Sequence, residues 1–160
     1  MTITLRPHQQ RVLDRLAAYD KGQVIVPTGG GKTICMIQDT INQQNNSQSG
    51  ITTVVVAPRI LLANQLCSEF LDLIDNAAVM HVHSGETEHF SSTKPALIAN
   101  WHRQAYCNQL IFTTYNSLKR IQEADIEVNT IYFDEAHNSV KRNFFPATEY
   151  FRELYVVKIS

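Results

Sequence analysis

The sequence has few cysteines, no long apolar run and no basic leader. Its three cysteines, Cys35, Cys67 and Cys107, are far apart and odd in number, and none belongs to a Cys-x-x-Cys pair that would clamp zinc. No stretch approaches the roughly 20 apolar residues that span a bilayer, and the N-terminus lacks a basic segment followed by an apolar one. These absences predict a soluble, cytoplasmic protein in a reducing compartment, without a membrane partner.

The net charge is also close to zero, with 14 Lys and Arg against 15 Asp and Glu. Bulk attraction to nucleic acid is therefore excluded, and any nucleic-acid binding must come from a local surface. The length of 160 residues, with 44% hydrophobic residues, is that of one domain with a single packed core. We expect residues 1–160 to form that domain.

Apolar segments with two different spacings alternate along the chain. Short runs rich in β-branched residues predict buried strands over residues 23–26, 52–57, 78–82, 110–113 and 130–133. Helical spacing of apolar residues precedes the first of these strands, over 12–17, and follows the second, over 62–73. The alternation predicts an α/β fold, a mostly parallel central sheet with helices on both faces.

The remaining segments are less regular. Residues 42–50 are polar and end in glycine, which predicts a flexible surface connection, and 85–94 predict another exposed connection. Residues 95–106 are compatible with a helix or a loop. Residues 154–159 are compatible with a last strand.

A glycine-rich segment follows the first predicted strand. The run VIVPTGGGKT, residues 24–33, leads into a helical segment over 34–41. Glycines let backbone N–H groups curl around phosphate oxygens, and the next helix N-terminus adds its positive dipole end. Lys32 would reach the β and γ phosphates, and the Thr33 hydroxyl would ligate magnesium. Val26 replaces the first glycine of the usual pattern, and the alternative is a glycine-rich turn with a solvated lysine.

Two carboxylates, Asp134 and Glu135, follow the strand predicted over 130–133. In a parallel sheet the C-terminal strand ends gather at one edge, where the glycine-rich segment would also lie. Asp134 could complete the magnesium shell, and Glu135 could orient and deprotonate an attacking water. The alternative is an acidic first turn of the next helix, which the helix dipole favours.

Together these segments resemble superfamily 2 helicases and translocases, especially the DEAH-containing branch that includes restriction-enzyme motor subunits and repair helicases. The matching segments are LRPHQ at 5–9 (adenine recognition), PTGGGKT at 27–33 (motif I), VVVAPR at 54–59 (motif Ia), FTTYNSL at 112–118 (motif Ib) and DEAH at 134–137 (motif II). The resemblance implies a RecA-like P-loop NTPase domain that uses ATP and Mg²⁺. It also implies a nucleic-acid partner, DNA by family analogy with RNA possible.

The resemblance assigns further roles within the ATP site. Gln9 would hydrogen-bond the adenine edge, with Arg6 supporting that pocket, and His137 would couple the nucleotide and nucleic-acid sites. The phosphate cradle would comprise Pro27, Thr28, Gly29, Gly30, Gly31, Lys32 and Thr33. The alternatives are an ordinary polar residue at the start of a helix for Gln9, and a partly buried histidine with a local hydrogen bond for His137.

The resemblance also implies contacts to a nucleic-acid backbone. Pro58 and Arg59 would begin a helix that touches it. Thr113 and Thr114 would offer hydroxyl and backbone contacts to phosphates, which position a strand without reading its bases. A solvent-facing arginine and ordinary strand-end threonines are the alternatives.

Other polar residues are given no functional role. His81, His83 and His89 cluster around a strand end without a cysteine or carboxylate at convincing metal spacing, so we expect loop polarity. Trp101 is expected to pack a helix rather than to stack bases.

Two features of the family are missing from these residues, the Ser-Ala-Thr type motif after DEAH and the second RecA-like domain. We therefore expect a truncated N-terminal motor domain, weak or inactive by itself, because the second domain normally supplies arginines to the γ phosphate. The alternative function is a catalytically silent module that binds nucleotide or DNA. A small nucleotide kinase is a third hypothesis, but no arginine-rich lid segment is evident.

Overall fold

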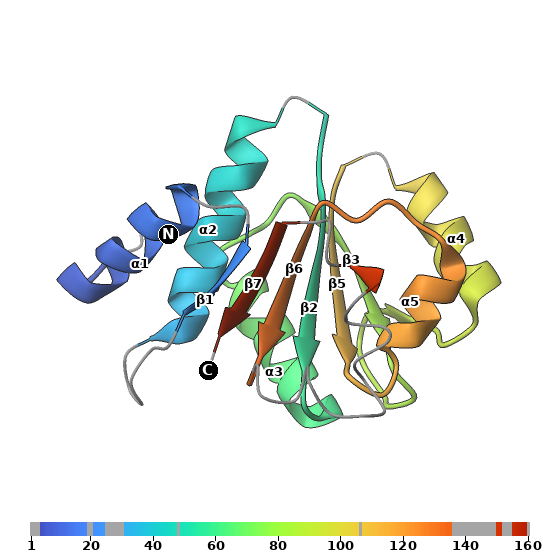
Figure 1. The fold of residues 1–160 in the computed structure, drawn as a ribbon. Helices are drawn as coiled ribbons and strands as arrows, with labels where there is room; N and C mark the ends of the chain where they lie inside the picture. Colours follow the sequence, from blue (N-terminus) through green and yellow to red (C-terminus); the bar gives the residue numbers. More distant parts are fainter. Residues whose placement is uncertain are drawn as a thin grey trace.

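The computed structural model describes residues 4–18, 21–24, 31–47, 49–105, 107–135, 150–151 and 155–159. In these ranges a central sheet is covered by helices on both faces (Figure 1). The elements in chain order are α1 Pro7–Ala18, β1 Lys21–Val24, α2 Lys32–Asn46, β2 Thr52–Ala57, α3 Ile60–Leu71, β3 Ala77–Val82, β4 Phe90–Ser91, α4 Pro95–Gln104, β5 Asn108–Thr114, α5 Leu118–Ala124, β6 Thr130–Asp134 and β7 Tyr155–Ile159.

The sheet is parallel at every pairing between described strands, in the order β1-β7-β6-β2-β5-β3-β4. β2 lies between β6 and β5, and all six of its residues are buried. Burial on both faces explains why its residues do not alternate between polar and apolar, since a strand covered by helices on each side has no face turned to water. Because the strands are parallel, their C-terminal ends lie at one edge of the sheet, at the arrowheads in Figure 1.

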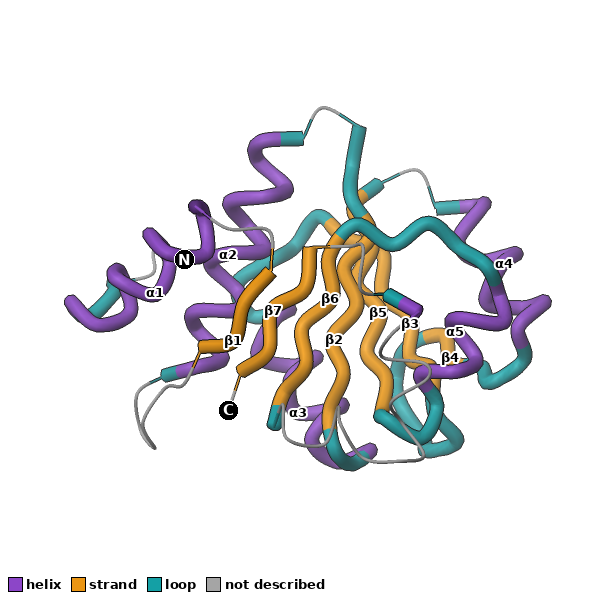
Figure 2. Tube along the Cα trace, viewed as in Figure 1, coloured by secondary structure: helices purple, strands orange, loops and turns teal. Residues whose placement is uncertain are grey.

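Two apolar cores lie on opposite faces of the sheet. On one face α1, α2 and α3 pack against alternate residues of the central strands, including Val55 and Phe112. On the other face α4, α5 and Phe151 pack against the intervening residues, including Val54 and Ile111. Figure 2 shows the two groups of helices on either side of the strands. The sheet therefore contributes side chains to both cores by simple alternation.

The predicted α/β architecture is confirmed, and most element boundaries agree within two residues. β2 has the predicted bounds, and β7 confirms a last strand. β1 is described over Lys21–Val24, while residues 25 and 26 of the predicted strand lie outside the described residues. Residues 95–104, compatible with helix or loop in the sequence, form α4.

Two predicted connections contain regular structure. α2 continues to Asn46, so residues 42–46 are helical rather than a flexible connection. Two of their polar side chains are turned inward: Gln44 is buried, and Gln43 Nε2 donates to the Tyr132 hydroxyl at 3.2 Å. The segment 85–94 contains β4, a two-residue strand that pairs with β3. No described helix combines the length and apolar character needed to cross a membrane.

Candidate functional site

The start of α2 and the end of β6 bring one lysine against two carboxylates. Lys32 Nζ lies 2.8 Å from Asp134 Oδ1 and 3.0 Å from Glu135 Oε1. Lys32 is the first residue of α2, and Asp134 is the last of β6. In Figure 1 the start of α2 and the arrowhead of β6 lie at the same edge of the sheet. Residues 103 positions apart in the sequence therefore meet at this edge.

The charges at this contact are only partly shielded from water. Burial by itself lowers the pKa of Lys32, but its close contacts with Asp134 and Glu135 and the negative charges of these carboxylates outweigh burial and raise the pKa above its ordinary value. Asp134 is buried, whereas the Glu135 side chain is 40% exposed. The contact between Asp134 Oδ1 and Lys32 is an ion pair without hydrogen-bond geometry. Lys32 thus remains a cation beside an acidic pair that one ammonium does not fully satisfy.

The backbone after β6 is held by Tyr115. Its hydroxyl donates to the Asp134 carbonyl at 2.8 Å and lies 3.5 Å from the Glu135 carbonyl. Glu135 has φ 53, a left-handed conformation that is uncommon for a residue with a side chain. We infer that Tyr115 positions this turn. Sequence reasoning missed this role, and the only signal was the place of Tyr115 in the segment 112–118.

A cavity of about 180 Å³ lies between the start of α2 and the acidic pair. Lys32, Thr33, Asp134 and Glu135 all line it, together with Glu69 of α3. A second, more open hollow of about 530 Å³ shares Lys32, Thr33 and Glu69 with it and extends to Gly31. The hydroxyl of Thr33 and the carboxylate of Asp134 are hard oxygen ligands of the kind Mg²⁺ prefers. With Oδ1 of Asp134 short of a hydrogen bond, the residues present fit a magnesium ion and phosphates.

Gln9 connects the N-terminal segment to the glycine loop. It is 3% exposed, its Oε1 accepts from the Arg6 backbone N–H at 2.8 Å, and its Nε2 donates to the Gly31 carbonyl at 3.3 Å. Gly31 has φ 74, and a Cβ there would collide with Gln9 Nε2. A glycine is required at this position both for the backbone conformation and for the close approach of Gln9.

The other predicted ATP-site residues are not described. Pro27, Thr28, Gly29 and Gly30 of the phosphate cradle lie outside the described residues, and so does His137. Their roles remain predictions.

The residues predicted to contact a nucleic-acid backbone lie at the same edge of the sheet. Arg59 is exposed and occupies the N-cap position of α3, directly after Pro58, without a capping hydrogen bond from its side chain. Thr113 and Thr114 end β5, and both are buried. The Thr113 hydroxyl donates to the Val82 carbonyl at 2.8 Å, so in this conformation the sheet holds it and it does not face solvent.

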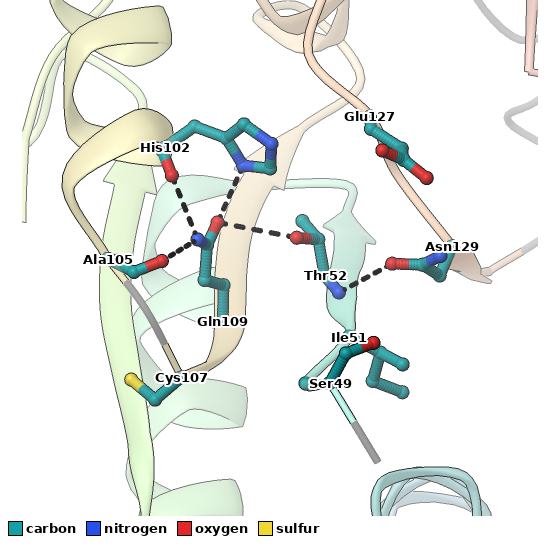
Figure 3. A pocket seen from close by; sticks show the side chains of 10 residues that line it. Ser49, Ile51, Thr52, His102, Ala105, Cys107, Gln109, Glu127 and Asn129 are labelled. Carbon is teal, nitrogen blue, oxygen red and sulfur yellow. Dashed lines mark hydrogen bonds between the residues drawn. The ribbon is translucent and has the colours of Figure 1, made fainter. Parts of the chain in front are cut away.

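A polar hollow of about 360 Å³ lies at the opposite edge, where β2, β5 and β6 begin (Figure 3). Gln109 is at its base, and its amide bonds to His102, Ala105 and Thr52. Because both polar atoms of this amide are paired within the protein, Gln109 is an internal brace, and its amide is not available to orient a ligand.

The histidine group differs from expectation. His81 and His83 are buried, so the prediction of loop polarity is wrong for them. His81 lies in β3, and its pKa is lowered to about 4 by burial and by the neighbouring His83 and His89. Cys67 of α3 lies near His81 and His89, a neighbour that sequence spacing did not reveal.

The chain matches the family model described as "Type III restriction enzyme, res subunit" over residues 2–160. Comparison with curated protein sequences gives no match.

Several solved structures share the fold. One is the nuclease-deletion mutant of the Type ISP restriction-modification enzyme LlaGI in complex with a DNA substrate mimic, at 22% identity and TM-score 0.79, covering 99% of this chain and 17% of that one. The UvsW helicase from bacteriophage T4 matches at 15% identity and TM-score 0.72, covering 99% of this chain and 52% of that one. The Pyrococcus furiosus Hef helicase domain matches at 20% identity and TM-score 0.69, with coverages of 97% and 33%.

This chain therefore spans between 17% and 52% of the length of these proteins. Since the family model covers nearly the whole chain, the chain belongs to the Type III restriction enzyme, res subunit family, and its fold is the RecA-like fold that these helicase and restriction-enzyme structures share.

Proposed function

We propose that this domain binds MgATP between α2 and β6 and hydrolyses it, as part of an ATP-dependent nucleic-acid helicase or translocase. The observation that carries the proposal is the contact of Lys32 with Asp134 and Glu135 in a cavity that Thr33 also lines. A lysine at a helix start beside two carboxylates at a strand end is the arrangement that a phosphate chain and its metal ion require.

Each residue has a distinct task in this proposal. Lys32 exchanges its carboxylate partners for the β and γ phosphates when nucleotide binds. Thr33 and Asp134 would hold magnesium, which when bound supplies positive charge to the phosphate oxygens. Glu135 orients the attacking water and accepts its proton, and Tyr115 keeps Glu135 in place. Gln9, next to Gly31, would bind the adenine, and His137 would couple the two sites.

DNA is the proposed nucleic-acid partner. Support comes from the exposed Arg59 at the same sheet edge as Lys32, and from the solved LlaGI structure, which contains a DNA substrate mimic. Phosphate contacts from Arg59 and from the ends of β2 and β5 would position a strand without reading its sequence. We propose a cytoplasmic location on the same grounds of family and chemistry.

Hydrolysis by this domain alone should be slow. An arginine supplied to the γ phosphate accelerates related NTPases by on the order of 10³ to 10⁵. In helicases of this type the second RecA-like domain supplies it, and this domain would work within a longer protein.

The test separates a motor domain from a silent binding module. MgATP binding is measured by calorimetry, and phosphate release is measured with and without single-stranded DNA. The unmodified chain should bind MgATP and release phosphate slowly, Glu135→Gln should keep binding but lose release at least tenfold, and Lys32→Met should lose binding. Arg120→Met, which breaks an exposed ion pair with Glu123, is the matched control and should change neither.

Other outcomes would favour the rivals. Nucleotide binding with the same residual turnover in the unmodified chain and in Glu135→Gln would identify a silent module. Phosphorylation of added nucleosides would identify a kinase.

A further inference from the structure

A second group of chemistry-bearing side chains lies between α3 and the edge of the sheet, and it shares no residue with the cavity around Lys32. Cys67 comes from α3, His81 from β3, and His89 from the residue before β4. One ligand atom from each lies within 4.8 Å of the other two. Three metal-binding side chains from three separate segments thus bring their ligand atoms close together.

We propose that Cys67, His81 and His89 bind one Zn²⁺ ion. Their spacing is close to three corners of a zinc tetrahedron: His81 Nε2 lies 3.4 Å from His89 Nδ1, and Cys67 Sγ lies 3.8 Å from His89 Nδ1. Usual zinc bond lengths in a tetrahedron place two imidazole nitrogens about 3.4 Å apart, and a nitrogen and a thiolate sulfur about 3.6 Å apart. A small shift of the Cys67 side chain would complete the geometry.

The donor set selects the metal. One thiolate and two imidazoles suit zinc and copper, whereas magnesium and calcium prefer oxygen ligands. Cys67 and His81 are buried, and His89 is half-buried. The hollow in front of them, of about 290 Å³, is also lined by the exposed Glu86 and Glu88. This hollow provides an entry path, negative charge near the ion, and room for water or a carboxylate as fourth ligand.

A further contact would orient His81. Its Nδ1 lies 3.2 Å from His83 Nε2, the kind of outer-shell contact that fixes a ligating imidazole. Zinc on His81 Nε2 leaves the His81 proton on Nδ1, so His83 has to accept it at Nε2. His83 then carries its own proton on Nδ1, so it gives up the contact from the Gly85 N–H, now 3.1 Å long. Its Nε2 no longer has a proton to donate to Asn64 Oδ1, now 3.2 Å away. Binding therefore includes a local rearrangement at Gly85 and at Asn64.

The consequence would be structural. The ion would join α3 to β3 and to the segment before β4. α3 begins directly after Arg59 and carries Glu69, which lines the cavity around Lys32. Zinc would therefore hold in place the helix that lies between the proposed nucleic-acid surface and the proposed nucleotide site.

The experiment uses the purified 160-residue chain freed of metal by a chelator. Zn²⁺ is titrated in competition with a chromophoric chelator, and Co²⁺ serves as a spectroscopic substitute. We expect one equivalent of Zn²⁺ to bind, the midpoint of thermal unfolding to rise, and the Co²⁺ form to absorb by thiolate-to-cobalt charge transfer with intense tetrahedral d–d bands.

The variants localise the site. His89→Gln changes a half-buried residue and should leave the fold intact, as circular dichroism would verify. Loss of an outer-shell partner typically weakens metal binding by roughly 10- to 100-fold. Because His89 is a proposed direct ligand, His89→Gln should weaken Zn²⁺ binding by more than this. Cys67→Ala should abolish the charge-transfer band. Cys107→Ser, at an exposed cysteine, is the matched control and should leave binding unchanged.

Three results would overturn the proposal. These are no stoichiometric binding of Zn²⁺, equal affinity in His89→Gln and the unmodified chain, or loss of the cobalt thiolate band in Cys107→Ser rather than in Cys67→Ala. The Lys32→Met variant keeps all three proposed zinc ligands. Nucleotide binding and zinc binding can therefore fail independently, and the two measurements distinguish which proposal is wrong.

Discussion

At the scale of single residues, the site consists of unlike charges held together before any ligand arrives. Asp134 is buried, and an isolated carboxylate in that position would be costly. Lys32 offsets this cost, yet its side chain remains 30% exposed, so water screens the pair and leaves the ammonium able to change partners. A fully buried ion pair would be a poorer receptor for phosphate, because breaking it would leave two desolvated charges.

Tyr115 gives a prediction at this scale. Tyr115→Phe removes the hydroxyl that donates to the Asp134 carbonyl and should lower the free energy of unfolding by about 1–2 kcal/mol, measured by urea denaturation. Tyr150→Phe is the control, because the Tyr150 hydroxyl bonds Asp125 at the exposed surface, and its effect should stay within about 0.5 kcal/mol. Equal losses in the two variants would contradict the positioning role of Tyr115.

The same residue predicts a pH dependence. Burial, and then the charges of Asp134 and Glu135, raise the pKa of Tyr115 well above its ordinary value. A group whose pKa is raised in the folded state stabilises the fold below its unfolded pKa, and this stability is lost as pH rises above about 10. Above that pH the unmodified chain should lose stability faster than Tyr115→Phe, by up to about 1.4 kcal/mol per pH unit. Parallel stability curves for the two proteins would refute the assignment.

At the scale of secondary-structure elements, α4 depends on one side chain of β5. Gln109 Nε2 donates to the carbonyls of His102 and Ala105 at 3.0 and 2.9 Å, and its Oε1 accepts from His102 Nδ1 at 2.7 Å (Figure 3). These carbonyls belong to the C-terminal end of α4, which has no further turn to satisfy them. A strand residue therefore caps a helix.

Replacing this cap tests the link. Gln109→Leu should lower the free energy of unfolding by about 2–3 kcal/mol and speed hydrogen exchange of the last turn of α4, because several buried hydrogen bonds are lost together. Gln104→Leu, at an exposed position in the same turn, is the control. Similar denaturation midpoints for both variants would show that α4 does not depend on the cap.

At the scale of the whole molecule, one sheet separates two cores, and the question is whether they unfold together. Phe70 is fully buried on the face of α3 and packs edge-on against Phe112 at 5.4 Å. Trp101, the single tryptophan, packs on the opposite face. Phe70→Ala should cost about 3–5 kcal/mol. Because both cores share the central strands, fluorescence of Trp101 and far-ultraviolet circular dichroism should shift together. Separate transitions for the two probes would show independent cores.

Much of this organisation could be predicted from local patterns. β2 is predicted to the residue because β-branched residues follow one another along it, as expected of a strand buried on both faces. The meeting of Lys32 with Asp134 follows from topology, since parallel strands end at one edge. The packing of Trp101 from a helix onto the core, which is expected from its large apolar side chain, is also confirmed.

Other features depend on partners far along the chain. In the sequence, the polar end of α2 resembles a surface connection. Its Gln43 bonds Thr130 and Tyr132, and no local sequence pattern reveals partners so far along the chain. The burial of His81 beside Cys67 was hidden for the same reason. The sequence alone thus determined the alternation of strands and helices and the edge where the charged motifs meet, because these depend on periodicity and chain order. Only the tertiary structure decided which polar side chains are buried against one another, because that depends on contacts between elements distant in the sequence.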